Sequence, residues 1–213
     1  GDAAMTLANV GGNLAIDAGS GVSLDGAVHV GNALALNAGG SVSVNATLAT
    51  GGDASLAVTN DVSLANSGQF TVGGALSSRS ATLNLGAGSL LQVAGGANVQ
   101  TDGDATFATV SVGGDLALAA GGRVAFNDVV NVAGQAALQG DALAFDKAFS
   151  VGDALTVNAA GAVTQAAGSA IQVGADLVAT TGAWQMGAGS LLAAGRSLSL
   201  ATTGDQALAQ VLS

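Results

Sequence analysis

Residues 110–126 read VSVGGDLALAAGGRVAF, and this stretch predicts the fold of the chain. It contains three pairs of apolar residues, and the single residue inside each pair gives the period that places both members on one face of an extended strand. Gly113-Gly114 and Gly121-Gly122 separate the pairs. Because glycine adopts positive φ without a steric penalty, these glycines predict sharp corners between three short strands.

The same unit recurs along the chain at intervals of 19 to 22 residues. The last apolar residue before the first corner defines an anchor column: Val10, Val30, Thr50, Val72, Val93, Val112, Val132, Val151, Val173 and Ala194. Positions four and six residues after each anchor are apolar in every copy except at Ser78. Internal repeats of about 20 residues or more are typical of solenoids, propellers and arrays.

The repeat predicts which side chains point inward. The predicted core columns contain the following residues: Val10, Leu14, Ile16, Val30, Leu34, Leu36, Leu56, Val72, Leu76, Val93, Val99, Val110, Val112, Leu116, Leu118, Val124, Phe126, Val132, Leu138, Val151, Leu155, Val157, Val173, Leu177, Leu198 and Leu200.

These columns predict an all-β, right-handed parallel β-helix of about ten coils, each with roughly 20 residues and three short strands. We expect residues 1–213 to form a single array, with partial coils at 1–9 and 203–213, excised from a longer fibrous protein. A helical fold is disfavoured because the 34 glycines would each cost about 1 kcal/mol in a helix interior. A left-handed β-helix requires a six-residue rhythm that the chain lacks.

Two local features refine this prediction. The longer intervals indicate extra loop residues at one corner. Polar residues precede the second corner in several coils, and we expect them to satisfy corner amides through local turn bonds. These residues are Asp17, Asn37, Gln100, Gln139 and Asn158.

Composition excludes several functional classes. The formal charge of −10 opposes binding to nucleic acid, which requires a basic surface. Without cysteine the chain offers neither a disulfide framework nor a thiolate metal site, and we predict no metal and no cofactor. Polar residues and glycine interrupt every apolar run before the roughly 18 to 20 residues of a spanning helix, so we predict no membrane span.

One group of residues resembles a site, because Asp102, Asp104, Arg123 and Asp141 are predicted at the same corner of three consecutive coils. Carboxylates that hold calcium beside a basic residue are the chemistry expected of β-helices that bind or cleave acidic sugars. A solvated corner with a ladder of ion pairs explains the same residues, and we favour that interpretation.

Other candidate residues have plain structural explanations. His29 is the only histidine and is predicted to face outward, without a partner for metal or triad chemistry. Trp184 is predicted to pack inward, and a sugar-stacking platform is the alternative if the register differs by one residue. Lys147 and Asp146 are adjacent and therefore face opposite sides. We find no Ser, His and Asp set, phosphate loop or RGD tripeptide.

The units VGNALALNAGGSVSV at 30–44, VGGDLALAAGGRVAF at 112–126 and VGDALTVNAAGAV at 151–163 resemble the haemagglutinin repeats of filamentous-haemagglutinin-like exoproteins. The resemblance covers essentially the whole chain. It implies a right-handed β-helical fibre, export through an outer-membrane two-partner-secretion transporter, and attachment to host cells or other bacteria. The family's secretion domain, its integrin-type tripeptide and a basic glycan-binding patch are absent from this segment.

We therefore expect a non-catalytic shaft of a secreted Gram-negative surface adhesin, with host receptors bound through other regions of the parent protein. One alternative is a β-helix face that binds a glycan or protein, and another is the stalk of a contact-dependent toxin. A polysaccharide-degrading enzyme is disfavoured by the scarcity of basic residues. Open strand edges at both ends predict end-to-end self-association of the fragment.

Overall fold

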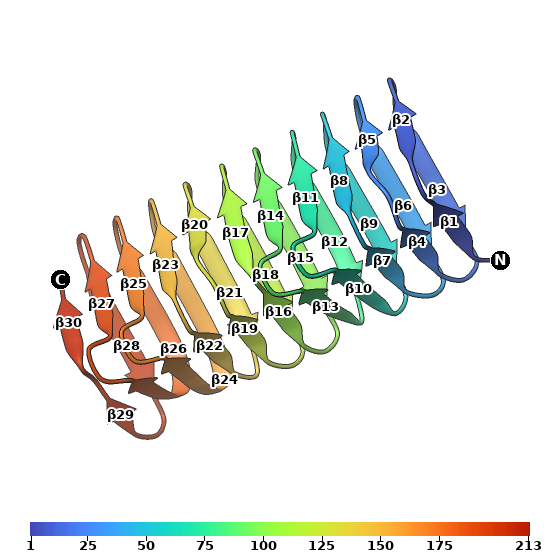
Figure 1. The fold of residues 1–213 in the computed structure, drawn as a ribbon. Coiled ribbons are helices and arrows are strands. Elements are labelled where there is room, and N and C mark those ends of the chain that lie inside the picture. Colours follow the sequence, from blue (N-terminus) through green and yellow to red (C-terminus); the bar gives the residue numbers. More distant parts are fainter.

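The computed structural model describes all 213 residues. The chain forms thirty β-strands, connected by turns and wound into one elongated solenoid without a helix (Figure 1). Each coil has three faces, and all strand pairings are parallel, joining equivalent strands of neighbouring coils. The first face is an 11-stranded sheet, while the second and third faces form one continuous 19-stranded sheet. The predicted β-helical fold is therefore confirmed.

The strands of the first face are β2 (Ala8–Val10), β5 (Val28–Val30), β8 (Thr47–Thr50), β11 (Gln69–Val72), β14 (Leu90–Val93), β17 (Thr109–Val112), β20 (Val130–Val132), β23 (Ala148–Val151), β25 (Ala170–Val173), β27 (Leu191–Ala194) and β30 (Gln210–Leu212). The second face contains β3 (Leu14–Ala18), β6 (Leu34–Ala38), β9 (Ala54–Val58), β12 (Leu76–Ser80), β15 (Ala97–Thr101), β18 (Leu116–Ala120), β21 (Ala136–Gly140), β28 (Leu198–Thr202), and the first halves of β24 (Leu155–Gln165) and β26 (Leu177–Met186). The third face contains β1 (Ala3–Met5), β4 (Val22–Leu24), β7 (Val42–Val44), β10 (Asp61–Leu64), β13 (Thr82–Leu85), β16 (Ala105–Phe107), β19 (Val124–Phe126), β22 (Leu143–Phe145), the second halves of β24 and β26, and β29 (Gln206–Ala207).

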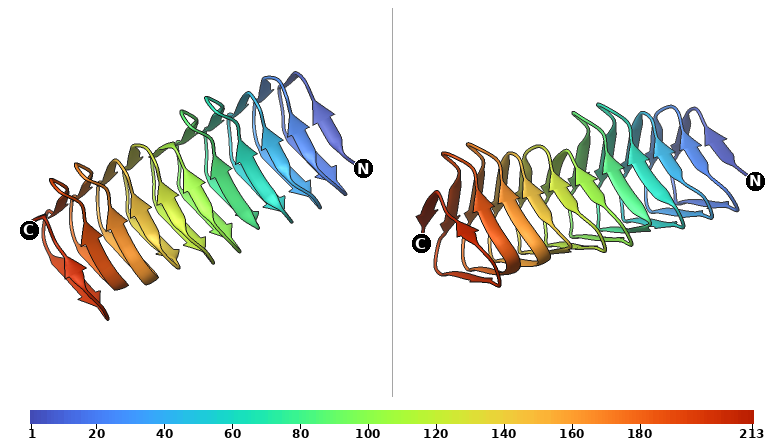
Figure 2. Two further views of the ribbon diagram at one scale, coloured as in Figure 1. Left: turned by 60° about the horizontal axis from the view of Figure 1, so that its bottom comes forward. Right: turned by 90° about the horizontal axis from the view of Figure 1, so that it is seen from below.

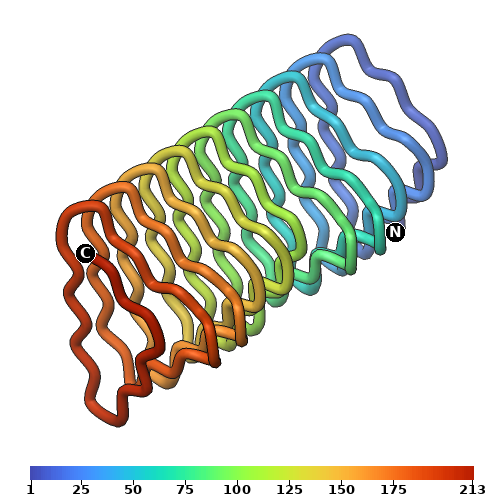
Figure 3. Tube along the Cα trace, turned by 60° about the vertical axis from the view of Figure 1, so that its left-hand side comes forward, coloured from blue at the N-terminus to red at the C-terminus, as the bar shows by residue number.

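The coils stack in the register that the sequence columns define. Each anchor residue from Val10 to Ala194 is the direct Cα partner of the next anchor along the chain. The column that begins at Leu14 is paired in the same way as far as Leu198. The Cα trace winds right-handed with the two termini at opposite ends of the rod (Figure 3).

Inward side chains form one hydrophobic core along the length of the rod. The inner columns are buried in every interior coil, but Val10, Leu14, Leu198 and Leu200 are only half-buried. These four residues lie in the terminal coils, where no further coil covers one side of the side chain. Burial therefore depends on having neighbouring coils on both sides, as expected for a solenoid.

Aromatic residues fill the centre of the rod. The rings of Phe107, Phe126 and Phe145 stack at centroid distances of 5.2 Å, and Phe149 packs edge-on against Phe126 and Phe145. Aromatic pairs in these geometries add about 0.5–1.5 kcal/mol beyond burial of their area. The 19-residue spacing from Phe107 to Phe126 and to Phe145 places them in one column.

The glycines of the first two corners are needed for a different reason than the one we predicted. None of Gly113, Gly114, Gly121 and Gly122 has a positive φ. A Cβ atom at Gly113 would instead lie 2.3 Å from the carbonyl oxygen of Ala94 in the preceding coil, and one at Gly121 would lie 2.2 Å from that of Asp102. Close approach of stacked backbones therefore selects glycine here.

The third corner, between the third and first faces, accounts for the longer intervals. Four residues form the turns at 65–68, 86–89, 166–169 and 187–190, whereas the other turns at this corner are shorter. The longer turns project as two neighbouring pairs, coloured green to teal and orange in Figure 2. Three of them contain a glycine with φ near +70°, at Gly88, Gly168 and Gly189, where a positive φ is indeed required.

Candidate functional site

The four residues predicted to share a corner do so. Asp102 and Asp104 follow β15, Arg123 follows β18, and Asp141 follows β21, all at the second corner of consecutive coils. All four side chains are exposed. The corner is thus a solvated edge of the rod and has no enclosed pocket at these residues.

The predicted ladder of ion pairs through Arg123 is not formed, because the guanidinium of Arg123 makes no salt bridge. Asp102 instead faces Arg79 of the preceding coil, with a nitrogen–oxygen distance of 3.8 Å between two largely exposed side chains. Exposed pairs of this kind contribute about 0–1 kcal/mol to stability. No three acidic or histidine side chains in the structure converge in a geometry that could hold a metal ion.

The corner carboxylates bind backbone instead. Asp104 Oδ1 accepts a hydrogen bond from the backbone N–H of Arg123 at 2.8 Å. Asp53 and Asp115 accept the N–H groups of Ala75 and Gln135 in the same way at the first corner. In each case the carboxylate belongs to one coil and the amide to the next, so the aspartates connect neighbouring coils where the strand ladder is interrupted.

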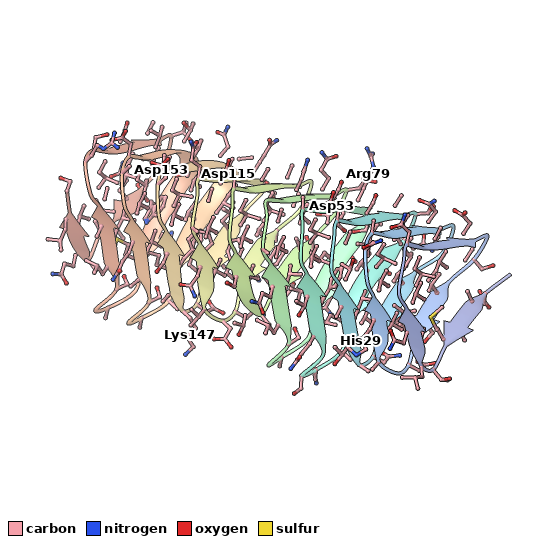
Figure 4. All side chains as sticks on the ribbon, turned by 90° about the horizontal axis from the view of Figure 1, so that it is seen from above. His29, Asp53, Arg79, Asp115, Lys147 and Asp153 are labelled. Atoms are coloured by element: carbon pink, nitrogen blue, oxygen red, sulfur yellow. The ribbon has the colours of Figure 1, made fainter.

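The same connection recurs with asparagine and at the beginning of the chain, in the bonds Gly21 N to Asp2, Ala33 N to Asn13 and Ala87 N to Asn66. Sequence reasoning missed this role. The sequence did contain a signal for this role. In most of these pairs an Asp or Asn at a corner is followed, one coil later, by a non-acidic residue at the equivalent position. Figure 4 shows Asp53, Asp115 and Asp153 along one edge of the rod, with Lys147 on the opposite side.

One carboxylate has a shifted pKa. Hydrogen bonds to Asp25 from the Ser23 hydroxyl (2.6 Å) and from the Asn45 side-chain amide (2.7 Å) lower the pKa of Asp25 below its ordinary value of 3.8, and this effect outweighs the small desolvation that raises it. The three residues lie at the exposed edge between the third face and the third corner. This cluster is a surface hydrogen-bond network that joins two neighbouring coils.

The structure excludes the sugar-stacking role considered for Trp184. The indole is fully buried, and its Nε1–H donates to Gln165 Oε1 at 3.3 Å. Gln165 is itself 3% exposed and donates through Nε2 to the carbonyl of Leu191 at 3.0 Å. His29 points outward from β5, as predicted.

The polar residues before the second corner do not bond the corner amides, contrary to our expectation. Asn37 donates to the carboxylate of Asp17 at 2.7 Å, which makes a ladder along the second face. Gln100, Gln139 and Asn158 also point outward from this face, and their amides make no hydrogen bond within the protein. In the same column Ala57 follows Asn37 and Ala119 separates Gln100 from Gln139, whereas Gln139 and Asn158 are direct Cα partners that make no side-chain hydrogen bond.

The free amides border a shallow depression on the second face with a volume of about 330 Å³. We name it the amide bowl and define it by Asn98, Gln100, Gln139, Thr156 and Asn158 around a floor of Ala117, Ala119 and Ala137. Larger grooves run along the first corner, with volumes of about 630 and 580 Å³. The 630 Å³ groove is lined by Ser111, Asn131, Ser150 and Gln172 on the first face, and the other includes Asp53 and Asp115.

One family model is similar to part of the chain. A family described as repeats of unknown function (DUF5649) matches residues 11–77, which cover the first three coils and part of the fourth. Neither the curated proteins nor the solved structures contain a match. Together with the stacked coils, this similarity identifies a repeat protein with a β-helical fold. The structure contains no apolar helix of membrane-spanning length.

Proposed function

We propose that this chain is a non-catalytic shaft segment of a large secreted bacterial surface adhesin, in which it spaces and presents adhesive regions for attachment to host cells. The observation that carries the proposal is the unbroken register of the anchor column from Val10 to Ala194. Every coil adds about 4.8 Å to the rod, so ten coils give a spacer of roughly 50 Å. Because no coil interrupts the register, the anchor column contains no hinge at which the rod could bend.

The distribution of side chains supports the same role. The acidic side chains lie at corners or within two residues of them, and several of them bind backbone rather than converge on a site. The repeat units resemble those of filamentous-haemagglutinin-like proteins, from which we infer export by a two-partner-secretion transporter and placement at the cell surface. A chain without cysteine or proline suits export in an unfolded form, because neither disulfides nor proline isomerisation delay its folding.

Deletion of whole coils tests the spacer role. Removing residues 113–151 takes out two coils and joins Val112 to Gly152. Because Val112 and Val151 occupy the same column, the new junction matches the natural one between Val151 and Gly152. Small-angle scattering should show a folded rod that is shorter by two coil rises, about 10 Å. Removing residues 113–122 is the matched control, since it joins an anchor to the second corner and should abolish folding.

Three outcomes would overturn the proposal. A compact particle in solution, with no change in length after the whole-coil deletion, would contradict a rod-like spacer. Hydrolysis of polysaccharides by the purified chain would contradict a non-catalytic role. Antibodies against the chain should label the surface of intact source cells, and labelling confined to the cell interior would contradict export.

A further inference from the structure

The coils that contain β24 and β26 cross the second corner differently from the coils before them. In each earlier coil, one to three residues outside any strand separate the second face from the third. β24 and β26 instead run through this corner as continuous strands, drawn in orange in Figure 2. Between two paired positions at the corner, β24 has Ala160 and Gly161 whereas β26 has only Gly182, which is a β-bulge. No turn therefore determines where the third face begins in these two coils.

The backbones also stack less tightly where β26 passes this corner. A Cβ atom at Gly121 would lie 2.2 Å from the carbonyl oxygen of Asp102, so a larger residue could not occupy that position without displacing the backbone. A Cβ atom at Gly182 would lie 2.8 Å from the carbonyl oxygen of Gly161, which is a milder overlap. A coil that slides brings another residue into the glycine position. The steric barrier to sliding is therefore lower for β26 than for the coil of Gly121.

Apolar packing does not distinguish one alignment of β26 from another. Side chains alternate between the two faces of a strand, so a slide of two residues keeps the inward set inward. In the observed register, Val163 of β24 pairs with Trp184 of β26. A two-residue slide would place Met186 beside Val163, and both of these residues are apolar. The aliphatic columns alone would accept either alignment of the third-face halves.

One buried polar network does distinguish the two alignments. The Nε1–H of the fully buried Trp184 donates to Oε1 of Gln165 at 3.3 Å, and Nε2 of Gln165 donates to the carbonyl oxygen of Leu191 at 3.0 Å. The first of these is the only hydrogen bond between two side chains inside the core. A two-residue slide would move the indole by about 7 Å along the strand. It would leave the indole N–H and the carboxamide buried without each other, which costs free energy.

We propose that Gln165, Trp184 and Leu191 form a register lock, a hydrogen-bonded network that selects one alignment of β26 on β24. The lock acts where the corner and the apolar columns leave the alignment open. Buried polar groups set register in the same way in coiled coils, at a cost in stability. The network therefore acts on conformation, and apolar replacement of both side chains would retain burial without retaining the selection.

Disulfide trapping in the intact chain tests this proposal, because the chain has no cysteine of its own. Thr164→Cys with Gln185→Cys is the native pair, since these residues are outward Cα partners in the observed register. Ala162→Cys with Gln185→Cys is the slid pair, whose members become partners only after a two-residue slide. As diagonal neighbours they lie about 7–8 Å apart, which exceeds the usual span of a disulfide. With oxidised glutathione, only the native pair should form a disulfide while the lock is intact.

Gln165→Leu combined with Trp184→Phe removes the lock and keeps both positions apolar. In this background the yield of the slid pair should rise about tenfold, and circular dichroism should still show a folded β protein. Leu177→Ala is the matched control, because Leu177 is a fully buried residue of β26 that takes no part in the network. It weakens the same coil and should leave the slid pair reduced.

The proposal is overturned if the slid pair stays reduced after the lock is removed. It is also overturned if Leu177→Ala raises the yield of the slid pair as much as the double variant does. Trp184→Phe alone, which keeps Gln165 bonded to Leu191, carries the same test if the double variant does not fold. It should give a smaller rise than removal of the whole lock and a larger one than Leu177→Ala, and a yield equal to that of Leu177→Ala would contradict the proposal.

Discussion

Asp104 of one coil accepts the backbone N–H of Arg123 of the next coil at 2.8 Å, so a residue that looked like part of an ion-pair site is a connection between coils. The guanidinium of Arg123 takes no part in this contact. Stacked parallel strands satisfy their own amides, but corners leave some N–H groups without a carbonyl partner. Side-chain oxygens supply the missing acceptor at those corners.

Replacing Asp104 with alanine should therefore lower the free energy of unfolding by about 0.5–1.5 kcal/mol, because the Arg123 amide loses its acceptor. Hydrogen exchange at that amide should become faster. Asp104→Asn is the control, since its side-chain oxygen can still accept the bond and should retain most of the stability and protection. Equal losses in both variants would show that the charge matters rather than the acceptor.

Asp25 should titrate below its ordinary pKa of 3.8, because Ser23 and Asn45 donate hydrogen bonds to its charged form. A lowered folded-state pKa means that this contribution to stability is complete above the unfolded-state value and is lost as the pH falls through the folded-state pKa. The relevant window therefore lies below pH 3.8.

Side-chain carboxyl NMR titration of Asp25 measures this effect directly. Ser23→Ala and Asn45→Ala should each raise the pKa of Asp25 towards 3.8. An unchanged Asp25 pKa in both variants would contradict the hydrogen-bonded origin of the shift.

Ser78 and Thr50 are polar residues at inward positions, and they should respond oppositely to valine. Ser78 is 6% exposed, makes no hydrogen bond, and borders an apolar cavity of about 20 Å³ together with Leu56 and Val99. Ser78→Val should raise the free energy of unfolding by about 1 kcal/mol by filling that space.

The hydroxyl of Thr50, in contrast, donates to the carbonyl oxygen of Asn32. Thr50→Val should therefore lower the free energy of unfolding by about 1 kcal/mol, because it removes this hydrogen bond from an inward position. Denaturant unfolding measures both variants. The explanation fails if Ser78→Val destabilises the protein as much as Thr50→Val does.

Gly31 and Gly11 occupy the same column, but only Gly31 is stacked on a preceding coil. A Cβ atom at Gly31 would lie 2.4 Å from the carbonyl oxygen of Gly11, whereas one at Gly11 would contact nothing. Gly31→Ala should therefore destabilise the protein by about 1–3 kcal/mol. Gly11→Ala should be neutral or stabilise it by up to about 1 kcal/mol through reduced entropy of the unfolded chain. Thermal unfolding measures both variants. Equal shifts of the two unfolding midpoints would contradict the steric explanation.

Gln165→Leu should lower the free energy of unfolding by about 1–3 kcal/mol, because it leaves the buried Nε1–H of Trp184 without an acceptor. Gln185 lies on the same face one coil later and is exposed, so Gln185→Leu is the matched control and should change stability by less than about 0.5 kcal/mol. Fluorescence of the single tryptophan follows both unfolding transitions. An undiminished stability in Gln165→Leu would mean that the indole N–H needs no protein partner.

Much of the fold could be predicted because every coil of a solenoid places equivalent residues in the same local environment. Val93, Val112 and Val132 occupy equivalent positions, each followed by a small-residue corner and paired directly with the next along the rod, so one well-defined unit determines the rest. Prediction was weaker where coils differ. The roles of Gln165 and Trp184 depend on side chains 19 residues apart meeting inside a particular coil, and the periodic pattern does not encode that meeting.

The candidate site shows the same division. The sequence placed Asp102, Asp104, Arg123 and Asp141 at one corner, since position along the repeat determines the corner. It did not determine that Asp104 would bond to backbone or that Arg79 would approach Asp102, because side-chain torsions and the exact separation of coils decide those contacts. The free amides of Gln139 and Asn158 were misassigned for the same reason.

Apolar residues at alternate positions, glycine at corners and a repeat of about 20 residues were sufficient to determine a parallel stack and its inward columns, because both follow from local periodicity. The tertiary structure alone decided which polar groups are satisfied, which glycines are required, and where the surface is hollow. Those properties depend on distances of a few ångströms between coils, and such distances exist only once the chain has closed on itself.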